Sequence, residues 1–366
     1  MSDKPVRLKD VAEAVGVSIN TVSCVLNPRN PGNVKVSQAT RTAILKAARK
    51  LGYRRNTAAA RLVGCPTKTL GVLMHSLTHP LTAPIVDSFE EQAVALGYQC
   101  FIGCTRLRGL KKLEFVEQFL SHGVDGLLLT TIWNDPEVEH ALKIALDTRM
   151  PLVFIDYMWE ARPAPLICGN HYQGGQLLAR HVLEAGHRRL AFLCDEEQKN
   201  LRSITDRIRG VQDVISESGH SDASLELLWS PSHHSRDFAR VVHEAMQKPN
   251  SPTVVMCSGD LTAIEVMIGL RAYGVEVPKD ICVTGYDDLL TPYITANLHL
   301  DNQPMPWTLP LTTVRQPIAR IGSTAAQVLV DQIEGKFTGE QMEYLLDVEL
   351  VPSASSIPSK KLLAKS

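Results

Sequence analysis

Small polar side chains are concentrated in the segment 18–24, close to the N-terminus of this 366-residue chain. Hydroxyl and amide groups of this size can hydrogen-bond to the edges of base pairs when a helix presents them in the major groove of DNA. The candidate hydroxyl and amide side chains are Ser18, Asn20, Thr21 and Ser23, and Ile19 and Cys24 lie among them on the same outward face.

Two short helices joined by a tight turn at Gly16 must position these side chains. The first helix carries an apolar face that consists of Leu8, Val11, Ala12 and Val15. The second begins at Ser18, a good helix cap, and ends before Pro28. Its hidden face consists of Val22, Val25 and Leu26. This arrangement predicts a helix-turn-helix that enters a major groove.

A third helix is predicted from the cap Ser37 to Leu51, where Gly52 ends it. Its apolar face consists of Ala43, Ile44, Ala47, Ala48 and Leu51. The next segment, RRNTAAARLVG, favours a helix but has little apolar surface. We expect it to fold only against DNA or a partner chain, with a linker after it.

The charge of the chain is distributed unevenly. Residues 1–64 hold 12 Lys and Arg against three acidic residues, whereas the remainder holds 26 against 36. A basic head on an acidic body is typical of a nucleic-acid-binding domain attached to a second domain. Small helical domains are also basic by chance, but the helix-turn-helix pattern favours nucleic-acid binding.

From Thr69 onward, apolar segments of strand length alternate with helical segments. Two such series predict two doubly wound α/β lobes with parallel sheets and a ligand cleft between them. The predicted strands are 70–74, 98–104, 125–130, 151–156, 189–194, 225–230, 253–258 and 281–286. The predicted helices are 84–96, 115–122, 138–149, 172–185, 206–218, 238–247 and 261–273.

Several classes of protein are disfavoured by what the sequence lacks. The eight cysteines have no zinc-ligand spacing, and most stand in apolar segments, which fits a reducing cytosol. No signal peptide and no membrane-spanning segment is evident, so we expect a cytoplasmic protein. We also find no Gly-x-Gly-x-x-Gly after the first strand, no Walker motif and no Gly-x-Ser-x-Gly elbow. We therefore expect no enzyme, no catalytic residue, no metal and no cofactor.

The order of these segments resembles that of the lac repressor family of bacterial transcription regulators, over nearly the whole chain. The similar stretches are LKDVAEAVGVS, TVS, VLN, VSQATR, LGYRRN, TKTLGVL, GVDGLLL, AGHRRLAFL, RIRG, VPKDICVTGYDD and PLTTVRQP. The resemblance implies a DNA-binding headpiece (1–54), a hinge helix with a linker (55–68), and a periplasmic-binding-protein-like core (69–366). It implies a homodimeric repressor that a small carbohydrate-like effector releases from its operator DNA.

The same resemblance assigns roles to the N-terminal residues. Ile19 and Asn20 occupy the positions that discriminate between operators, where Asn20 can bond to adenine and Ile19 can contact a thymine methyl group. Cys24 replaces a usual arginine and removes a guanine contact of ~1–3 kcal/mol, which predicts an atypical operator. Leu62 matches the leucine that wedges into a minor-groove base step, with a core role as the alternative. The remaining DNA-contacting positions are Asn27, Ser37, Thr40, Tyr53 and Asn56.

The resemblance also implies an effector site made of Asp156, Ser203, Arg207, Trp229 and Asp287. Arginine and carboxylate side chains with fixed geometry recognise hydroxyl or anionic groups. Each of three residues has an ordinary alternative: Asp287 as a turn residue, Arg207 as an ion-pair partner at a helix start, and Trp229 as a core residue.

Four positions bear on the class of effector. Relatives often carry two aromatic residues where this chain has Leu81 and Thr82, which disfavours a flat purine. Gly259 and Gly169 stand where an asparagine and an aspartate are common. The loss of these polar groups suggests a ligand other than a plain hexose, and a sugar acid is the resulting hypothesis.

Two other functions compete with this interpretation. A sugar-binding receptor without DNA function would need only the core, but it leaves the basic headpiece unexplained. An α/β enzyme is disfavoured because His181, His187, His233 and His234 have no nucleophile arranged beside them in the sequence. The C-terminal tail shows no leucine heptads, so a dimer is expected rather than a tetramer.

Overall fold

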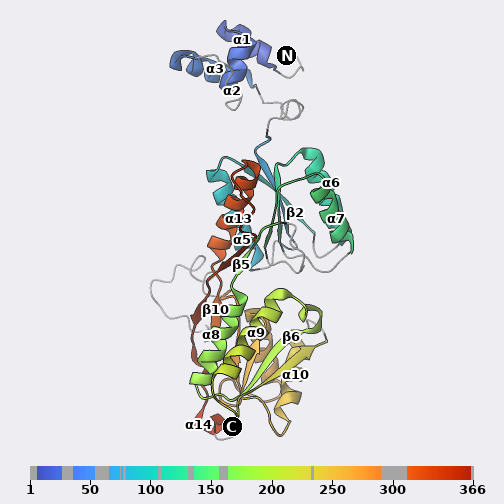
Figure 1. Cartoon of the computed structure of the whole chain (residues 1–366), viewed down its shortest axis with the longest axis vertical. Helices are drawn as coiled ribbons and strands as arrows, with labels where there is room; N and C mark the ends of the chain where they lie inside the picture. The colour runs from blue at the N-terminus through green and yellow to red at the C-terminus, as the bar shows by residue number, and fades with distance from the viewer. Residues whose placement is uncertain are drawn as a thin grey trace. The chain divides into compact units, whose positions relative to one another are not determined.

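The computed structural model describes residues 6–26, 36–53, 66–74, 76, 80–105, 109–130, 136–155, 164–231, 235–289 and 311–363. The chain forms two compact units, Met1–Lys68 and Thr69–Ser366. Figure 1 shows the helices of the first unit and the sheets of the second.

The first unit contains the helices α1 (Leu8–Val15), α2 (Ile19–Leu26) and α3 (Gln38–Leu51). Gly16 and Gly52 end α1 and α3 with φ angles of 71° and 72°, a left-handed conformation that favours glycine. The helices share a buried core of Val11, Ala12, Val22, Val25, Ile44 and Ala48. The helix-turn-helix prediction is confirmed, but the predicted apolar face of α3 is too wide. Ala43 and Leu51 are exposed because only the Ile44 side of α3 packs against the other two helices.

The second unit contains a six-stranded parallel sheet with strand order β11-β5-β4-β3-β1-β2. Its strands are β1 (Thr69–Met74), β2 (Gln99–Cys104), β3 (Gly126–Thr130), β4 (Leu152–Ile155), β5 (Leu166–Gly169) and β11 (Glu343–Leu346). Helices α5 (Thr82–Ala95) and α13 (Ile318–Ile333) lie side by side on one face. Helices α6 (Gly109–His122) and α7 (Pro136–Asp147) lie on the other face, as Figure 1 shows.

A four-stranded parallel sheet with strand order β7-β6-β8-β9 forms the second lobe. Its strands are β6 (Arg189–Asp195), β7 (Ser224–Ser230), β8 (Val254–Cys257) and β9 (Cys282–Thr284). One core cluster joins this sheet to α8 (His171–Glu184) and α9 (Arg202–Glu217). Another joins it to α10 (Ser235–Met246) and α11 (Asp260–Arg271) on the opposite face. The two predicted α/β lobes with parallel sheets are confirmed.

Within the described residues the chain crosses between the lobes three times, which the sequence did not predict. It leaves the first sheet at Gly169, returns after β10 (Thr313–Arg315) to form α13 and β11, and leaves again to β12 (Glu349–Val351). Strand β12 pairs antiparallel with β10. The first and third crossings lie close together, since the backbone N–H of Asn170 donates to the carbonyl oxygen of Leu346 and that of Val348 donates to the side chain of Gln173.

Four cysteines of the lobes are buried, as their apolar surroundings predicted: Cys168, Cys194, Cys257 and Cys282. Burial raises the pKa of the Cys194 and Cys282 thiols to about 12, which keeps them protonated. Such thiols act as small apolar side chains and are poor nucleophiles.

A buried histidine joins the C-terminal segment to the second lobe. The ring of His187 is fully buried, and its Nδ1 and Nε2 lie 2.8 Å and 3.2 Å from the Thr253 hydroxyl and the Ser356 carbonyl oxygen. Burial lowers the pKa of His187 to about 4, below its ordinary value of 6.5. A histidine that resists protonation only when folded lowers the stability of the fold as the pH falls.

We expect His187 to reduce the free energy of unfolding by about 2 kcal/mol between pH 7.5 and pH 5.0. The unfolded chain takes up a proton below about pH 6.5, whereas the folded ring stays neutral until about pH 4. Urea unfolding of the full chain and of His187→Asn at both pH values measures the effect. A steeper loss in the unsubstituted chain is expected, and equal slopes would contradict the assignment.

Candidate functional site

The first turn of α2 presents the side chains that could read DNA. Ser18, Ile19 and Asn20 are exposed, and Ile19 leaves 46% of its surface open although it is a large aliphatic residue. Thr21, Ser23 and Cys24 are partly exposed, while Val22 and Val25 on the opposite face are buried. Helix α2 therefore packs its apolar side on the headpiece core and exposes its other side, as a helix that enters the major groove of DNA does.

Two helices of the headpiece begin with the same Ser-x-x-Thr arrangement. The Ser18 hydroxyl accepts the backbone N–H of Thr21 at 3.1 Å, and the Ser37 hydroxyl accepts that of Thr40 at 3.1 Å. In both pairs the two hydroxyl groups lie 2.8 Å apart. A capped helix start carries partial positive charge, which suits a DNA phosphate group. Tyr53 follows α3 and packs on the headpiece core.

In the core, Arg207 and Asp287 lie together at the carboxyl end of the second sheet. Their closest nitrogen and oxygen atoms are 3.8 Å apart, and Arg207 is only 6% exposed. Asp287 and Asp288 have φ angles of 104° and 54°, a strained conformation that clusters at functional sites. The two neighbouring carboxylates pair with different arginines. Asp287 pairs with Arg207, and Asp288 accepts a hydrogen bond from Nε of Arg315 at 2.6 Å.

The Arg207 guanidinium has further partners that the sequence did not reveal. Nε and Nη2 lie 3.4 Å and 3.2 Å from Nδ1 of His171, and Nη1 donates to the Ser258 carbonyl oxygen. The guanidinium carbon lies 3.5 Å from the centre of the Tyr286 ring, a cation–π arrangement. His171 stands two residues after Gly169, where the chain leaves the first sheet, and no motif in the sequence marks this position.

Gln316 is a second side chain that the sequence did not single out. It is 3% exposed and donates to Asp287 at 2.7 Å, while its Oε1 has no hydrogen-bond partner within the described residues. A Cβ atom at Gly169 would stand 2.6 Å from that oxygen. Gly169 therefore leaves room for the buried Gln316, whose amide oxygen lies where a side chain at position 169 would have to start.

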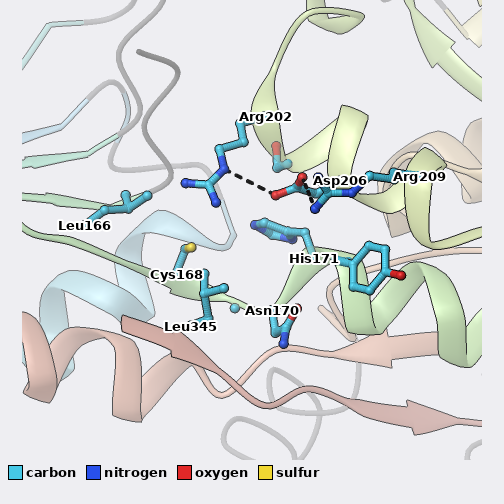
Figure 2. Close-up of a pocket in the computed structure, with 11 residues that line it drawn as sticks. Leu166, Cys168, Asn170, His171, Arg202, Asp206, Arg209 and Leu345 are labelled. Atoms are coloured by element: carbon cyan, nitrogen blue, oxygen red, sulfur yellow. Dashed lines mark ion pairs between the residues drawn. The ribbon is translucent and has the colours of Figure 1, made fainter. Parts of the chain in front are cut away.

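Ser203 lines a pocket of about 160 Å³ where β5 and β11 of one lobe meet α8 and α9 of the other. Figure 2 shows the side chains around it, among them Arg202, Asp206, His171 and Leu345. Arg202 and Arg209 both pair with Asp206, at 3.3 Å and 3.0 Å, and Arg202 also pairs with Glu343. The charged side chains of the pocket wall are therefore held in ion pairs with one another and with Glu343 next to the pocket.

The other predicted effector residues are placed differently. Trp229 is partly buried at the end of β7 and packs on the core cluster of α8 and α9, which is its ordinary alternative. Asp156, Asn27, Asn56 and Leu62 lie outside the described residues. The effector roles of Ser203, Arg207, Trp229 and Asp287 remain predictions.

A third carboxylate, that of Asp260, lies near the carboxylates of Asp287 and Asp288. Burial, with the nearby charges of Asp287 and Asp288, raises its pKa to about 7. Hydrogen bonds from the Thr313 hydroxyl at 2.6 Å and the Leu289 backbone N–H at 2.8 Å oppose this rise. Throughout the described ranges, no set of three His, Cys, Asp or Glu side chains is arranged to hold a metal ion. Within those ranges, no helix combines the length and the apolar character needed to cross a membrane.

Two family models match this chain. Residues 7–56 match the model described as bacterial regulatory proteins, lacI family, and residues 179–356 match a periplasmic binding protein-like domain. Among curated relatives, the HTH-type transcriptional repressor PurR of Photobacterium profundum is 27% identical over 94% of this chain and 96% of its own length. The PurR repressor of Aliivibrio fischeri (strain ATCC 700601 / ES114) is 28% identical over 95% and 97%.

Solved structures of similar fold cover nearly the whole chain. The lac repressor dimer bound to operator and the anti-inducer ONPF superposes with a TM-score of 0.74 at 25% identity, over 97% of this chain and 100% of that one. The complex of the transcriptional regulator CelR with cellobiose has a TM-score of 0.64 at 24% identity, over 96% and 99%. Residues 7–56 are thus a DNA-binding domain of the lacI family, joined to a periplasmic-binding-protein-like core, and the relatives and solved structures named here are repressors or regulators of this type.

Proposed function

We propose that this chain is a DNA-binding transcriptional repressor whose operator affinity is controlled by a small molecule bound in the core. The observation that carries this proposal is the exposed start of α2 on a well-packed three-helix headpiece. The curated relatives named above are transcriptional repressors, and the similar lac repressor structure is a complex with operator DNA.

The division of labour that we propose follows the predicted domains. Residues 1–54 bind DNA, residues 55–68 form the hinge and linker, and residues 69–366 bind the effector and form the dimer. The DNA-contacting residues are those predicted above, with bases read by the start of α2 and phosphates held by the capped starts of α2 and α3.

Sequencing of random duplex DNA selected by the purified full chain tests DNA recognition directly. We expect enrichment of an imperfect inverted repeat, because a symmetric dimer presents α2 twice. Mobility-shift titrations at fixed salt then give the ratio of specific to nonspecific affinity. Selection that enriches no sequence would contradict the proposed function.

Leu62 is proposed as the hinge residue that wedges between base pairs. Replacing Leu62 with alanine is expected to weaken operator binding while the affinity for the effector stays the same. Fluorescence anisotropy with labelled operator measures the first quantity, and calorimetry measures the second. An unchanged operator affinity would refute the wedge.

The proposed effector is a hydroxyl-rich, carbohydrate-like molecule that contacts Arg207 and Asp287. An arginine donor beside a carboxylate acceptor can bind neighbouring hydroxyl groups, which both donate and accept. The narrower hypothesis of a sugar acid requires the ligand's carboxylate to take the place of Asp287 beside Arg207, because that guanidinium is already paired.

A thermal-shift screen of the full chain separates these classes of effector. Neutral sugars, sugar acids, sugar phosphates and purine bases are the four arms, the last because the curated relatives carry the name PurR. A shift with sugar acids supports the narrower hypothesis, and a shift with neutral sugars alone leaves only the broader one. A shift with purine bases alone would overturn the carbohydrate-like effector.

Exposed apolar side chains of the core support the proposed homodimer. Phe101 and Ile102 on the edge strand β2 are 45% and 47% exposed, and Ile268 on α11 is 60% exposed. Apolar side chains at a subunit interface are exposed in the separate protomer and become buried in the dimer. A second copy of this chain is the proposed partner.

We expect Ile268→Asp and Phe101→Asp each to shift the chain from dimer to monomer. A charge placed in an apolar interface loses its hydration without gaining a partner. Light scattering coupled to size-exclusion chromatography measures the mass. Ile357→Asp is the matched control, since Ile357 is also 60% exposed but lies near the C-terminus. Dimers in both core variants would exclude these surfaces.

A further inference from the structure

One neighbouring helix, α8, supplies a hydrogen-bond partner of Arg207 and packs against Tyr286 and the Arg207 backbone. His171 in the first turn of α8 receives hydrogen bonds from Nε and Nη2 of Arg207 at 3.4 Å and 3.2 Å. A ring nitrogen can accept only when it carries no proton, so Nδ1 of His171 must be the acceptor atom. The ring is 5% exposed, which fixes its orientation by packing.

Two glycines one turn further along α8 leave room for the rest of the arrangement. A Cβ atom at Gly174 would overlap the Tyr286 hydroxyl group and stand 2.7 Å from the adjoining ring carbon. Tyr286 is the ring that lies under the guanidinium of Arg207. A Cβ atom at Gly175 would overlap the backbone carbonyl oxygen of Arg207 itself. The absence of both side chains thus permits the close approach of α9 and of the tyrosine.

We infer that His171, Gly174 and Gly175 are positioning residues for Arg207: α8 holds the guanidinium between the His171 ring, the Tyr286 ring and Asp287. This inference rests on the proposed function only in that Arg207 contacts the effector. Because α8 begins directly after the Gly169 crossing, the orientation of Arg207 is set by the element that joins the two lobes. A change in the angle between the lobes would reach Arg207 through a single helical turn.

The Arg207 side chain itself provides a readout that needs no effector. In full-length protein labelled with ¹⁵N-arginine, the Nε–H group is expected to show a ring-current-shifted signal that exchanges slowly with water, because the guanidinium carbon lies over the Tyr286 ring and Nε faces His171. Arg207→Lys identifies the signal by its loss. His171→Asn keeps an acceptor near the Nδ1 position and is expected to retain the signal, whereas His171→Phe and Gly174→Ala are expected to shift it or to expose it to exchange.

Gly322→Ala is the matched control. A Cβ atom there would overlap the carbonyl oxygen of Ile85, so this change crowds two packed helices, α13 and α5, in the other lobe, away from Tyr286 and His171. It is expected to lower the melting temperature as Gly174→Ala does, while the Arg207 signal stays in place. If Gly174→Ala does not fold, the His171 pair carries the test alone.

The inference fails if His171→Phe keeps the Arg207 signal unchanged, or if Gly322→Ala moves it as far as Gly174→Ala does. A compound that gives a shift in the thermal screen adds a second measurement. Its affinity is expected to fall roughly tenfold in His171→Phe and to recover in His171→Asn, as for one misoriented charged hydrogen bond. A screen without any shift would count against the proposed effector and would leave the Arg207 signal as the test of positioning.

Discussion

Replacing Arg207 with alanine is expected to abolish the response to the effector while operator binding persists. The substitution removes the charged donor of the site, worth about 1.5–3 kcal/mol in hydrogen bonds to a ligand. It also leaves the Asp287 carboxylate beside Asp288 and Asp260 without its guanidinium partner, which disfavours the observed arrangement of the site. Together these effects predict a loss of effector affinity of roughly a hundredfold or more.

Arg240→Ala is the matched control for Arg207. Arg240 lies on α10, and its side chain is 44% exposed and paired with Asp237 and Glu244. An exposed pair of this kind contributes about 0–1 kcal/mol, so effector affinity and stability should change little. Calorimetric titration of both variants with a compound from the thermal screen, and operator binding without it, give the comparison. An Arg207→Ala variant that responds normally would remove Arg207 from the effector site.

Most of the strands that could be predicted are largely buried, although β2 and β7 were predicted and are partly exposed. Strand β5 was missed although its four residues are all buried, because it is short. Strands β3 and β8 are buried at every position, and such apolar segments between helices have few other interpretations. Strand β11 has the sequence EYLL and is only partly buried, and β10 has three residues, so neither shows a strand pattern. The lobe crossings depend on these two short elements, and for that reason they could not be read from the sequence.

The site shows the same limit in another form. Arg207 and Asp287 were predicted separately and meet at 3.8 Å, because each lies at a strand end or helix start that the family pattern marks. His171 and Gln316 were missed, since their roles depend on how α8, α9 and the crossing segments approach one another. Their partners lie 36 and 29 residues away in the chain, and no local spacing reports such a contact.

Replacing Asn20 with alanine is expected to erase much of the preference for the operator over random DNA. One bidentate contact to a base discriminates by about 1–3 kcal/mol, and a dimer makes that contact in both half-sites. The combined loss of about 2–6 kcal/mol corresponds to a specificity ratio lower by roughly 30-fold or more. Asn20 is exposed on α2, away from the buried Val22 and Val25, so the headpiece should remain folded.

Ser37→Ala separates base reading from phosphate binding in the same assay. It removes the hydroxyl that accepts the Thr40 backbone N–H and caps α3, and it leaves the surface of α2 unchanged. The affinities of the Ser37→Ala variant for operator and for random DNA should fall by the same factor, because a phosphate contact carries no sequence information. Competition titrations at constant salt compare the two variants. If Asn20→Ala lowered both affinities equally, the start of α2 would hold the DNA backbone, and the base-reading residues would have to lie elsewhere on the headpiece.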